Sequence, residues 1–302
     1  MITRKSLTLA TKQSDATNVL NHMVERFNQP NSFNPSIAYR SSSCFMALRH
    51  FGPDSTPPFE ASLLQYDIDS NVFVTVNLSH HAAEYGVSVV ADPKLFEMND
   101  EIWVTFNSGW ARSSNSLYLM RVSPTLGHPI EVEYASRQRI EKNWAFFVHA
   151  GRLRAVYSIT PFKQLSSDPP NNQSKKIVFN DDPGMTLANH NKPLAIGTQA
   201  IKIENDLFLI AHEKHSVLQY RAYAGRLVRL RLFDSRPQIL VSERRLIHSY
   251  SALLGSFRKH NKNLLSCTYF SGLASLGNGR AVIGYGINDL STGFAEAHIK
   301  DL

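Results

Sequence analysis

A short polar segment followed by an alternating apolar strand recurs five times along this chain of 302 residues. In each copy a strand leads through a turn into a second strand, and most of the turns contain Asn, Asp or Gly, as hairpin turns do. The paired segments are 33–37 with 44–49, 91–96 with 101–106, 141–144 with 152–157, 197–201 with 206–212, and 270–274 with 280–286. We therefore expect a chain built from repeated β-hairpins.

The spacing of the repeat indicates the architecture. Successive polar segments, taken at residues 34, 92, 141, 197 and 271, are separated by 58, 49, 56 and 74 residues. Units of this size with several short strands are typical of β-propeller blades, which take roughly 40–50 residues each before their loops are added. Because one blade cannot bury both faces of its sheet without neighbours, we predict an all-β fold with a single five-bladed β-propeller over residues 33–302.

Residues 1–32 precede the first repeat and have a different pattern. Leu20, Met23, Val24 and Phe27 recur at helical spacing within residues 16–27. We expect residues 1–32 to form an N-terminal tail and a capping helix, a short helical extension in front of the propeller.

Composition limits the partners and the location. The formal charge is +7, but the basic residues are dispersed and no nucleic-acid-binding module is recognisable. No run approaches the roughly 18 apolar residues of a membrane span, and the N-terminal segment lacks an apolar secretory core. Cys44 and Cys267 are far apart in apolar surroundings, which favours free thiols over a disulfide. These features predict a cytoplasmic protein with no nucleic-acid partner and no membrane span.

Polar residues at the strand ends form the candidate site. In a propeller the innermost strand of each blade lines the central channel, so its polar end residues converge at one mouth. This predicts a shared site for residues far apart in sequence: Asn34, Arg49, Asp92, Glu141, Lys142, Asn143, Thr198, His212, Tyr285 and Asp289. Chemistry at a glycosidic bond needs a general acid at the leaving oxygen and a group that activates or acts as the nucleophile, roles that suit Asp92 and Glu141. Cationic side chains can hold phosphate.

Ordinary structural interpretations stand beside these roles. Asp92 precedes Pro93, and Asp-Pro pairs commonly open turns. Glu141 and Lys142 also fit solvated charges at a strand end, and Asp289 also fits a turn. His212 and His215 lack the His-Glu-x-x-His spacing of a helical zinc site, so no metal and no other cofactor is expected.

At these residues the chain resembles the five-bladed propeller carbohydrate enzymes. It is most similar to family 130 of the glycoside hydrolases, the β-mannoside phosphorylases and mannosidases, and to the related propeller β-mannosyltransferases. The resemblance spans roughly residues 33–299 and rests on the order of short motifs: Asn34-Pro35 with Arg49, Asp92-Pro93-Lys94, Gly197-Thr198 with His212, and Tyr285-Gly286-Ile287-Asn288-Asp289. One motif departs from the family, whose usual Glu-Asp-Pro-Arg is Ala91-Asp92-Pro93-Lys94 in this chain.

The resemblance implies an enzyme that acts on glycosidic bonds, a family-130-like phosphorylase or hydrolase for β-mannoside-like sugars. It implies that Asp92 is the general acid at the central channel, acting in this family through a sugar hydroxyl. It further implies that Arg49 and Lys142 hold phosphate or substrate, and that His212 and Asp289 bind the sugar. The implied partners are a carbohydrate substrate with inorganic phosphate or a nucleotide sugar.

Other functions remain open on the sequence. A propeller glycosyltransferase in surface-glycan or oligosaccharide biosynthesis fits the same motifs, and so does a direct inverting hydrolase built on Asp92 and Glu141. A non-catalytic glycan-binding propeller is a further alternative, since fold does not dictate function. The polar segment 164–193, rich in Pro and Asn, is expected to be a long loop that either overhangs the site or faces solvent.

Overall fold

The computed structural model describes residues 6–9, 13–51, 59–109, 114–171, 173–182, 186–187, 193–217, 220–232, 238–249 and 264–302. Strands make up 60% of the structure, and the described part of the chain contains two α-helices. The prediction of an all-β fold is therefore confirmed. No helix in the described ranges is both long and apolar enough to cross a membrane.

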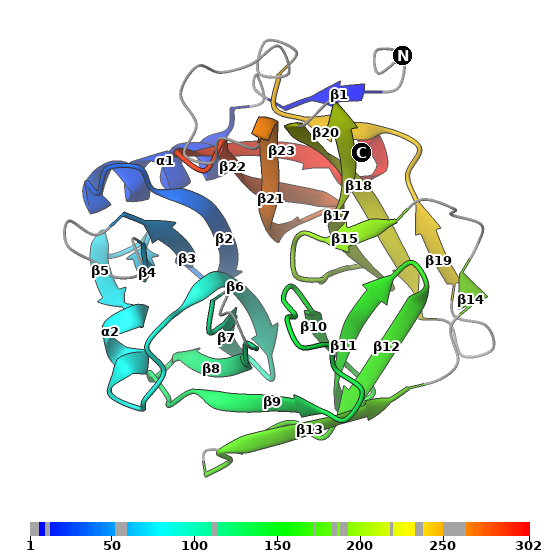
Figure 1. Ribbon diagram of the computed structural model, residues 1–302. Helices are drawn as coiled ribbons and strands as arrows, with labels where there is room; N and C mark the ends of the chain where they lie inside the picture. The colour runs from blue at the N-terminus through cyan, green and yellow to red at the C-terminus, as the bar shows by residue number, and fades with distance from the viewer. Residues whose placement is uncertain are drawn as a thin grey trace.

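Consecutive strands pair antiparallel in groups that follow one another around the molecule (Figure 1). The first group is a four-stranded sheet in chain order: β2 (Phe33–Arg40), β3 (Ser43–His50), β4 (Glu60–Asp67) and β5 (Val72–Asn77). An eight-stranded sheet follows: β6 (Ala91–Met98), β7 (Glu101–Asn107), β8 (Leu117–Ser123), β9 (Ile130–Tyr134), β10 (Ala145–His149), β11 (Arg152–Ile159), β12 (Phe162–Ser167) and β13 (Lys176–Asp181).

An eleven-stranded sheet contains the remaining strands. They are β1 (Ser6–Thr8), β14 (Thr186–Leu187), β15 (Leu194–Ile196), β16 (Ile201–Ile203), β17 (Asp206–Val217), β18 (Tyr220–Arg231), β19 (Gln238–Val241), β20 (Arg245–Ile247), β21 (Leu264–Gly277), β22 (Arg280–Ile287) and β23 (Ser291–His298). Parallel pairs join neighbouring groups within the large sheets, β9 with β13 and β18 with β21. A hairpin is present at each of the five repeats. In two of them the first strand starts later than predicted, because β10 begins at Ala145, after the segment 141–144, and β16 begins at Ile201.

The first and last strand groups meet at glycines. The Ser271 hydroxyl on β21 donates to the Pro35 carbonyl on β2 over 2.8 Å. A Cβ on Gly286 of β22 would lie 1.9 Å from Asn34 Oδ1, so only glycine permits this approach. β2 is therefore packed against β21 and β22 although some 230 residues separate them in sequence.

The N-terminal helix begins and ends as its sequence indicates. α1 (Asp15–Phe27) has Ser14 as its N-cap, and a capping box joins Ser14 and Thr17. Leu20 and Met23 are fully buried in a cluster with Met46 and Phe294, so the helix packs on β3 and β23. Residues ahead of it also join the fold, because β1 pairs in parallel with β20.

The segment 164–193 is not the continuous loop that its composition predicts. It contains the end of β12, all of β13 and the short β14; residues 172, 183–185 and 188–192 lie outside the described ranges. Ile177 and Phe179 are buried on β13, while Lys176, Val178 and Asn180 face solvent. This period-two alternation is a strand signal, and the surrounding Pro and Asn residues obscured it.

Cys44 is buried on β3 as a free thiol, in agreement with the prediction. The side chain of Cys267 lies outside the described part of the structure.

Candidate active site

Asp92 is the second residue of β6 and has an unusual backbone conformation. Its φ is +50°, it precedes Pro93, and a β-bulge lies between Ala91 and Lys94 in the pairing with β7. Asn34 has the same setting on β2, with φ +54° and a bulge between Phe33 and Ser36. Asp and Asn tolerate the left-handed region better than most residues, which explains these residue types ahead of proline. The bulge turns the Asp92 side chain away from the direction that regular strand alternation would give it.

Two cations bind the Asp92 carboxylate. Arg49 Nη1 on β3 donates to Oδ1 over 2.8 Å, and Lys142 Nζ, ahead of β10, donates to Oδ2 over 3.2 Å. The Asp92 side chain is 9% exposed and Lys142 is 54% exposed, so this cluster opens to solvent on the Lys142 side. The arginine is oriented by packing, since its guanidinium carbon lies 3.7 Å from the centre of the Phe59 ring and 4.9 Å from that of Phe33.

These charges decide the protonation state of Asp92. Burial by itself would raise the pKa of the carboxyl group, but the positive charges of Lys142, Arg49 and Lys94 outweigh it and hold the pKa well below the ordinary value. The same attraction raises the pKa of Lys142 despite partial burial. Asp92 is thus ionised in the unliganded protein at neutral pH.

Lys94, on β6, connects the eight-stranded sheet with the eleven-stranded sheet. It is 1% exposed, and its ammonium donates to Asn143 Oδ1 over 2.8 Å and to the carbonyl oxygen of Gly197. Burial lowers the pKa of Lys94 to about 7, with Lys142 also lowering it and Asp92 raising it. At neutral pH Lys94 is therefore divided between its charged and its neutral form.

His212 and Tyr269 form the aromatic side of the site. Their ring centres are 4.4 Å apart, and the Tyr269 hydroxyl accepts a hydrogen bond from Asn143 Nδ2 over 3.0 Å. His212, on β17, is 1% exposed, and its Nε2 accepts from the backbone N–H of Phe270 over 2.8 Å. Burial lowers its pKa well below the ordinary value, helped by the charges on Lys94 and Lys214. A neutral imidazole that accepts at Nε2 carries its proton on Nδ1.

A pocket of about 250 Å³ opens beside these residues. Its lining includes Lys142, Asn143, His212 and Tyr269, together with Lys214 on β17. The pKa of Lys214 is lowered by burial and by the charges of Lys142 and Arg221. Lys142 joins this pocket to Asp92, and the pair of lysines at its wall favours an anionic ligand.

The Glu141 carboxylate does not contact Asp92, although the sequence suggested a shared catalytic role for the two residues. Its Oε1 accepts hydrogen bonds from the Tyr157 hydroxyl and from the backbone N–H of Gln138, and its Oε2 lies 3.8 Å from Nε of Arg137. Its backbone is held by Asn115, which donates to the carbonyl over 2.6 Å and accepts from the N–H over 2.9 Å. These contacts face its own sheet; among the described residues, Tyr157 connects Glu141 with the pocket.

The remaining four residues of the predicted set are not among the site contacts described so far. Thr198 is fully buried, with its hydroxyl donating to Gln199 O and accepting from Ile210 N–H. Tyr285 is 1% exposed and meets His248 through its hydroxyl; burial raises its pKa to about 12. Asn34 packs on Gly286, and its Oδ1 has no hydrogen-bond partner in the described structure. Asp289 lies in the turn after β22, with φ +57°.

The structure thus joins Arg49, Asp92 and Lys142 in one set of contacts, and Asn143 and His212, through Tyr269, in another. The two sets meet at the pocket, which Lys142, Asn143 and His212 all line. Sequence reasoning missed Lys94, Tyr269 and Lys214 as members of the site. Lys94 was visible two residues after Asp92, where an isolated charge next to Leu95 and Phe96 signals a buried partner. Tyr269 carried no comparable signal.

No protein-family model matches the chain, and no curated protein sequence matches it. Solved structures do. One comes from family 130 of the glycoside hydrolases, described as mannoside phosphorylases that include glycoside hydrolases targeting β-1,2-mannosidic linkages in Candida mannan; it has 14% sequence identity and a TM-score of 0.58, over 90% of this chain and 85% of that one.

Two further structures come from Leishmania mexicana. MPT-4, a mannose phosphorylase in complex with a phosphate ion, has 14% identity and a TM-score of 0.55 over 95% of each chain. MPT-1, a GDP-Man-dependent mannosyltransferase, has 12% identity and a TM-score of 0.57 over 89% of this chain and 84% of that one. The chain has the fold of these carbohydrate enzymes. The resemblance in its motifs is thereby confirmed at the level of the fold.

Proposed function

We propose that this protein is a glycoside phosphorylase that moves a mannose-like unit between phosphate and a sugar hydroxyl. The observation that carries the proposal is the Asp92 carboxylate bound to Arg49 and Lys142, with Lys142 continuing into a pocket that also contains Lys214. Phosphate would enter at Lys142 and Lys214. The glycosidic bond would lie over Asp92, and the aromatic rings of Tyr269 and Tyr223 would flank the sugar.

The ionised state of Asp92 favours phosphorolysis over hydrolysis. In phosphorolysis a phosphate oxygen bonds to the anomeric carbon, the glycosidic C–O bond breaks, and the leaving oxygen receives a proton. Hydrogen phosphate brings that proton, so an ionised Asp92 can accept it and pass it to the leaving oxygen, either directly or through a sugar hydroxyl. The negative charge of bound phosphate would also offset the positive charge of Lys142, and this would raise the pKa of Asp92.

Direct hydrolysis makes different demands. A water nucleophile needs its own base, while the acid must hold a proton before the reaction starts. The cations around Asp92 oppose such a proton, and the contacts of Glu141 with Tyr157 and Gln138 turn its carboxylate away from this task. The site therefore supports the phosphate-dependent reaction better than an Asp92–Glu141 hydrolase.

A nucleotide-sugar transferase is the second candidate. Its supporting observation is the same ionised Asp92, which is ready to act as the general base that deprotonates an acceptor hydroxyl. The diphosphate of the donor would occupy the lysine pocket, and transfer would run from the donor to the acceptor sugar. A non-catalytic glycan-binding role would leave the Asp92 cluster without a chemical task.

Two further parts of the proposal concern architecture and location. We propose that the three sheets divide into the five blades of a propeller; the supporting features are the hairpin at each of the five repeats and the contact of β2 with β21 and β22. Residues 1–32 would cap it as an N-terminal extension, and residues 33–302 would form one domain. The buried free thiol of Cys44 supports a cytoplasmic location.

A product assay tests the reaction. The purified protein is incubated with mannobioses of defined linkage, with and without inorganic phosphate, and in parallel with GDP-mannose and simple acceptors. Mass spectrometry should detect a hexose 1-phosphate that forms only when phosphate is present. Free mannose formed equally without phosphate would identify a hydrolase instead, and a longer glycan formed only from GDP-mannose would identify the transferase.

A further inference from the structure

Lys94 binds a polar side chain of the pocket without lining the pocket itself. It is 1% exposed, and its ammonium donates to Oδ1 of Asn143, a lining residue, over 2.8 Å. An ammonium group has donors and no acceptor, so the oxygen of the amide must face it. The neutral amine keeps two N–H groups, one for this oxygen and one for the carbonyl of Gly197. A residue outside the pocket therefore fixes the orientation of the Asn143 amide.

The nitrogen of the same amide is available to a ligand. Asn143 Nδ2 donates to the Tyr269 hydroxyl over 3.0 Å. An amide nitrogen carries two hydrogens, so Asn143 retains a second N–H group. In the reversed orientation the amide would offer its oxygen in this place, and an anion would be repelled.

The imidazole of His212 is fixed in a similar way. Its Nε2 accepts from the backbone N–H of Phe270 over 2.8 Å, and its lowered pKa keeps the ring neutral, with the proton on Nδ1. In both the amide and the imidazole of this lining, a protein donor therefore already binds the acceptor atom. What each group retains is an N–H.

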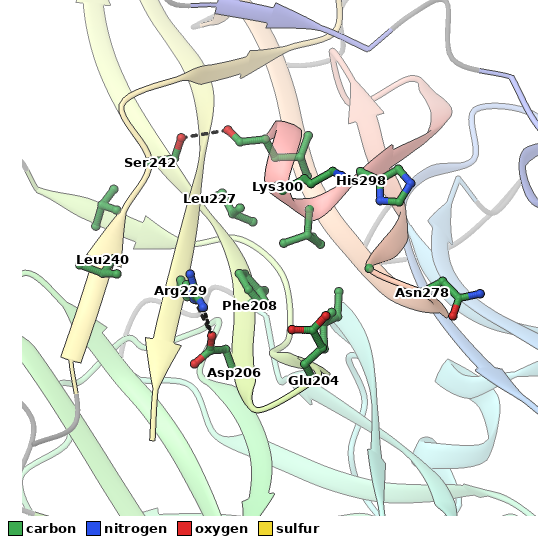
Figure 2. A pocket seen from close by; sticks show the side chains of 15 residues that line it. Glu204, Asp206, Phe208, Leu227, Arg229, Leu240, Ser242, Asn278, His298 and Lys300 are labelled. Atoms are coloured by element: carbon green, nitrogen blue, oxygen red, sulfur yellow. Dashed lines mark hydrogen bonds and ion pairs between the residues drawn. The ribbon is translucent and has the colours of Figure 1, made fainter. Parts of the chain in front are cut away.

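The charged groups of the described lining are cations, and none of its described residues is Asp or Glu. Lys142 shares its charge with Asp92, whereas Lys214 has no carboxylate partner within the described ranges. The cavity shown in Figure 2 differs, because its arginine, Arg229, is bound to Asp206 over 2.6 Å in the same wall. Cations and N–H groups without a carboxylate favour a ligand whose oxygens accept, an oxyanion.

We propose that Lys94 is a positioning residue that makes the Asn143 amide a donor for an oxyanion in this pocket. The inference rests on the proposed function, because the oxyanion concerned is the phosphate of that reaction. Lys94 acts through Asn143 and does not touch the ligand. Without Lys94 the amide can reverse, since the Tyr269 hydroxyl both donates and accepts and so binds either end of it.

Calorimetric titration with sodium sulfate tests this role apart from the reaction, because sulfate has acceptor oxygens like phosphate and is not a substrate for phosphorolysis. The variants are Lys94→Met, Asn143→Ala and the two combined. Lys94→Gln is a second replacement, whose amide binds Asn143 in either orientation, and Lys94→Arg keeps a donor-only cation. The control is Lys176→Met, which removes an exposed partner of Glu133 outside the pocket lining. Thermal unfolding of each variant checks the fold.

Asn143→Ala should raise the dissociation constant of sulfate about tenfold, the effect of one hydrogen bond to a charged group. Lys94→Met and Lys94→Gln should each raise it about threefold or more, because only part of that hydrogen bond is lost when the amide can reverse. Lys94→Arg and Lys176→Met should leave it unchanged. In the Asn143→Ala background, Lys94→Met should have no further effect.

An unchanged dissociation constant in Lys94→Met and Lys94→Gln would overturn the inference, and so would the absence of sulfate binding by the wild-type protein. An equal loss with and without Asn143 would also overturn it, because Lys94 would then act on the anion directly through its charge. If the binding results are as expected but no hexose 1-phosphate forms in the product assay, the proposed function alone is overturned.

Discussion

Asp92 Oδ1 lies 2.8 Å from Nη1 of Arg49, a guanidinium that is itself packed on the rings of Phe33 and Phe59. The carboxylate is thereby aligned before any substrate arrives, because packing on the two rings orients the cation that binds it. This alignment crosses a sheet boundary, from β3 to β6. Pre-organised charge of this kind acts without reorganisation at the moment of reaction.

Replacement of Asp92 by Asn should remove the proton transfer and leave the fold intact. Positioned acid–base groups contribute about 10²- to 10⁴-fold to rate, so kcat/KM should fall by about 100-fold or more. Steady-state kinetics and thermal unfolding measure the two properties on the same samples. Asp181→Asn is the control, since Asp181 is an exposed partner of Lys163 away from the pocket. Full turnover by Asp92→Asn would rule out the assigned role.

Lys142→Met should weaken phosphate binding more than sugar binding. The lysine contacts Asp92 and lines the anion pocket, and a charge-assisted hydrogen bond contributes about 1.5–3 kcal/mol. The KM for phosphate should rise about 10- to 100-fold while the KM for the sugar changes much less. Lys176→Met, which removes an exposed lysine paired with Glu133, should leave both constants unchanged. Equal losses for both substrates would contradict a phosphate site at Lys142.

Lys94 should make stability increase with pH above neutrality. Its pKa is about 7 in the folded protein, below the ordinary lysine value, so the unfolded chain binds more protons between these two pKa values. The free energy of unfolding then rises by up to about 1.4 kcal/mol per pH unit from pH 7 upward. Urea unfolding at pH 7, 8 and 9 should show this slope in the wild-type protein relative to Lys94→Met. Parallel curves for the two proteins would refute the shifted lysine.

Loss of the buried ion pairs of Glu213 should lower the free energy of unfolding. Glu213 is 3% exposed and binds Arg226 over 2.6 Å and Arg245 over 3.1 Å. Glu213→Gln leaves buried cations without their anion, and breaking a buried pair in this way typically costs about 3–5 kcal/mol. Denaturant unfolding should show a loss of that order. Glu296→Gln, whose partner Arg280 is exposed, should lose less than about 1 kcal/mol.

Local sequence patterns were sufficient for the strands and for part of the site. The alternation around 91–96 and 101–106 predicted β6 and β7, and Asp92-Pro93 at the strand start predicted where Asp92 lies. Period-two alternation is a local property, so it survives in the sequence regardless of what packs on the strand. The same reasoning failed for 164–193, where turn-forming residues on both sides concealed β13.

The sequence by itself determined the hairpin repeat, the all-β fold and the strand ends that carry Arg49 and Asp92. His212, expected at the end of a strand over 206–212, lies inside β17, which continues to Val217, and Lys142 lies ahead of β10. Only the tertiary structure decided which of these charges meet. Lys94 reaches Asn143 ahead of β10 and, in the neighbouring sheet, the carbonyl of Gly197, while Glu141 is drawn toward Tyr157 instead of Asp92. The reason is physical: strand patterns specify which face a side chain occupies, whereas pairing between charges depends on distances set by how separate sheets pack.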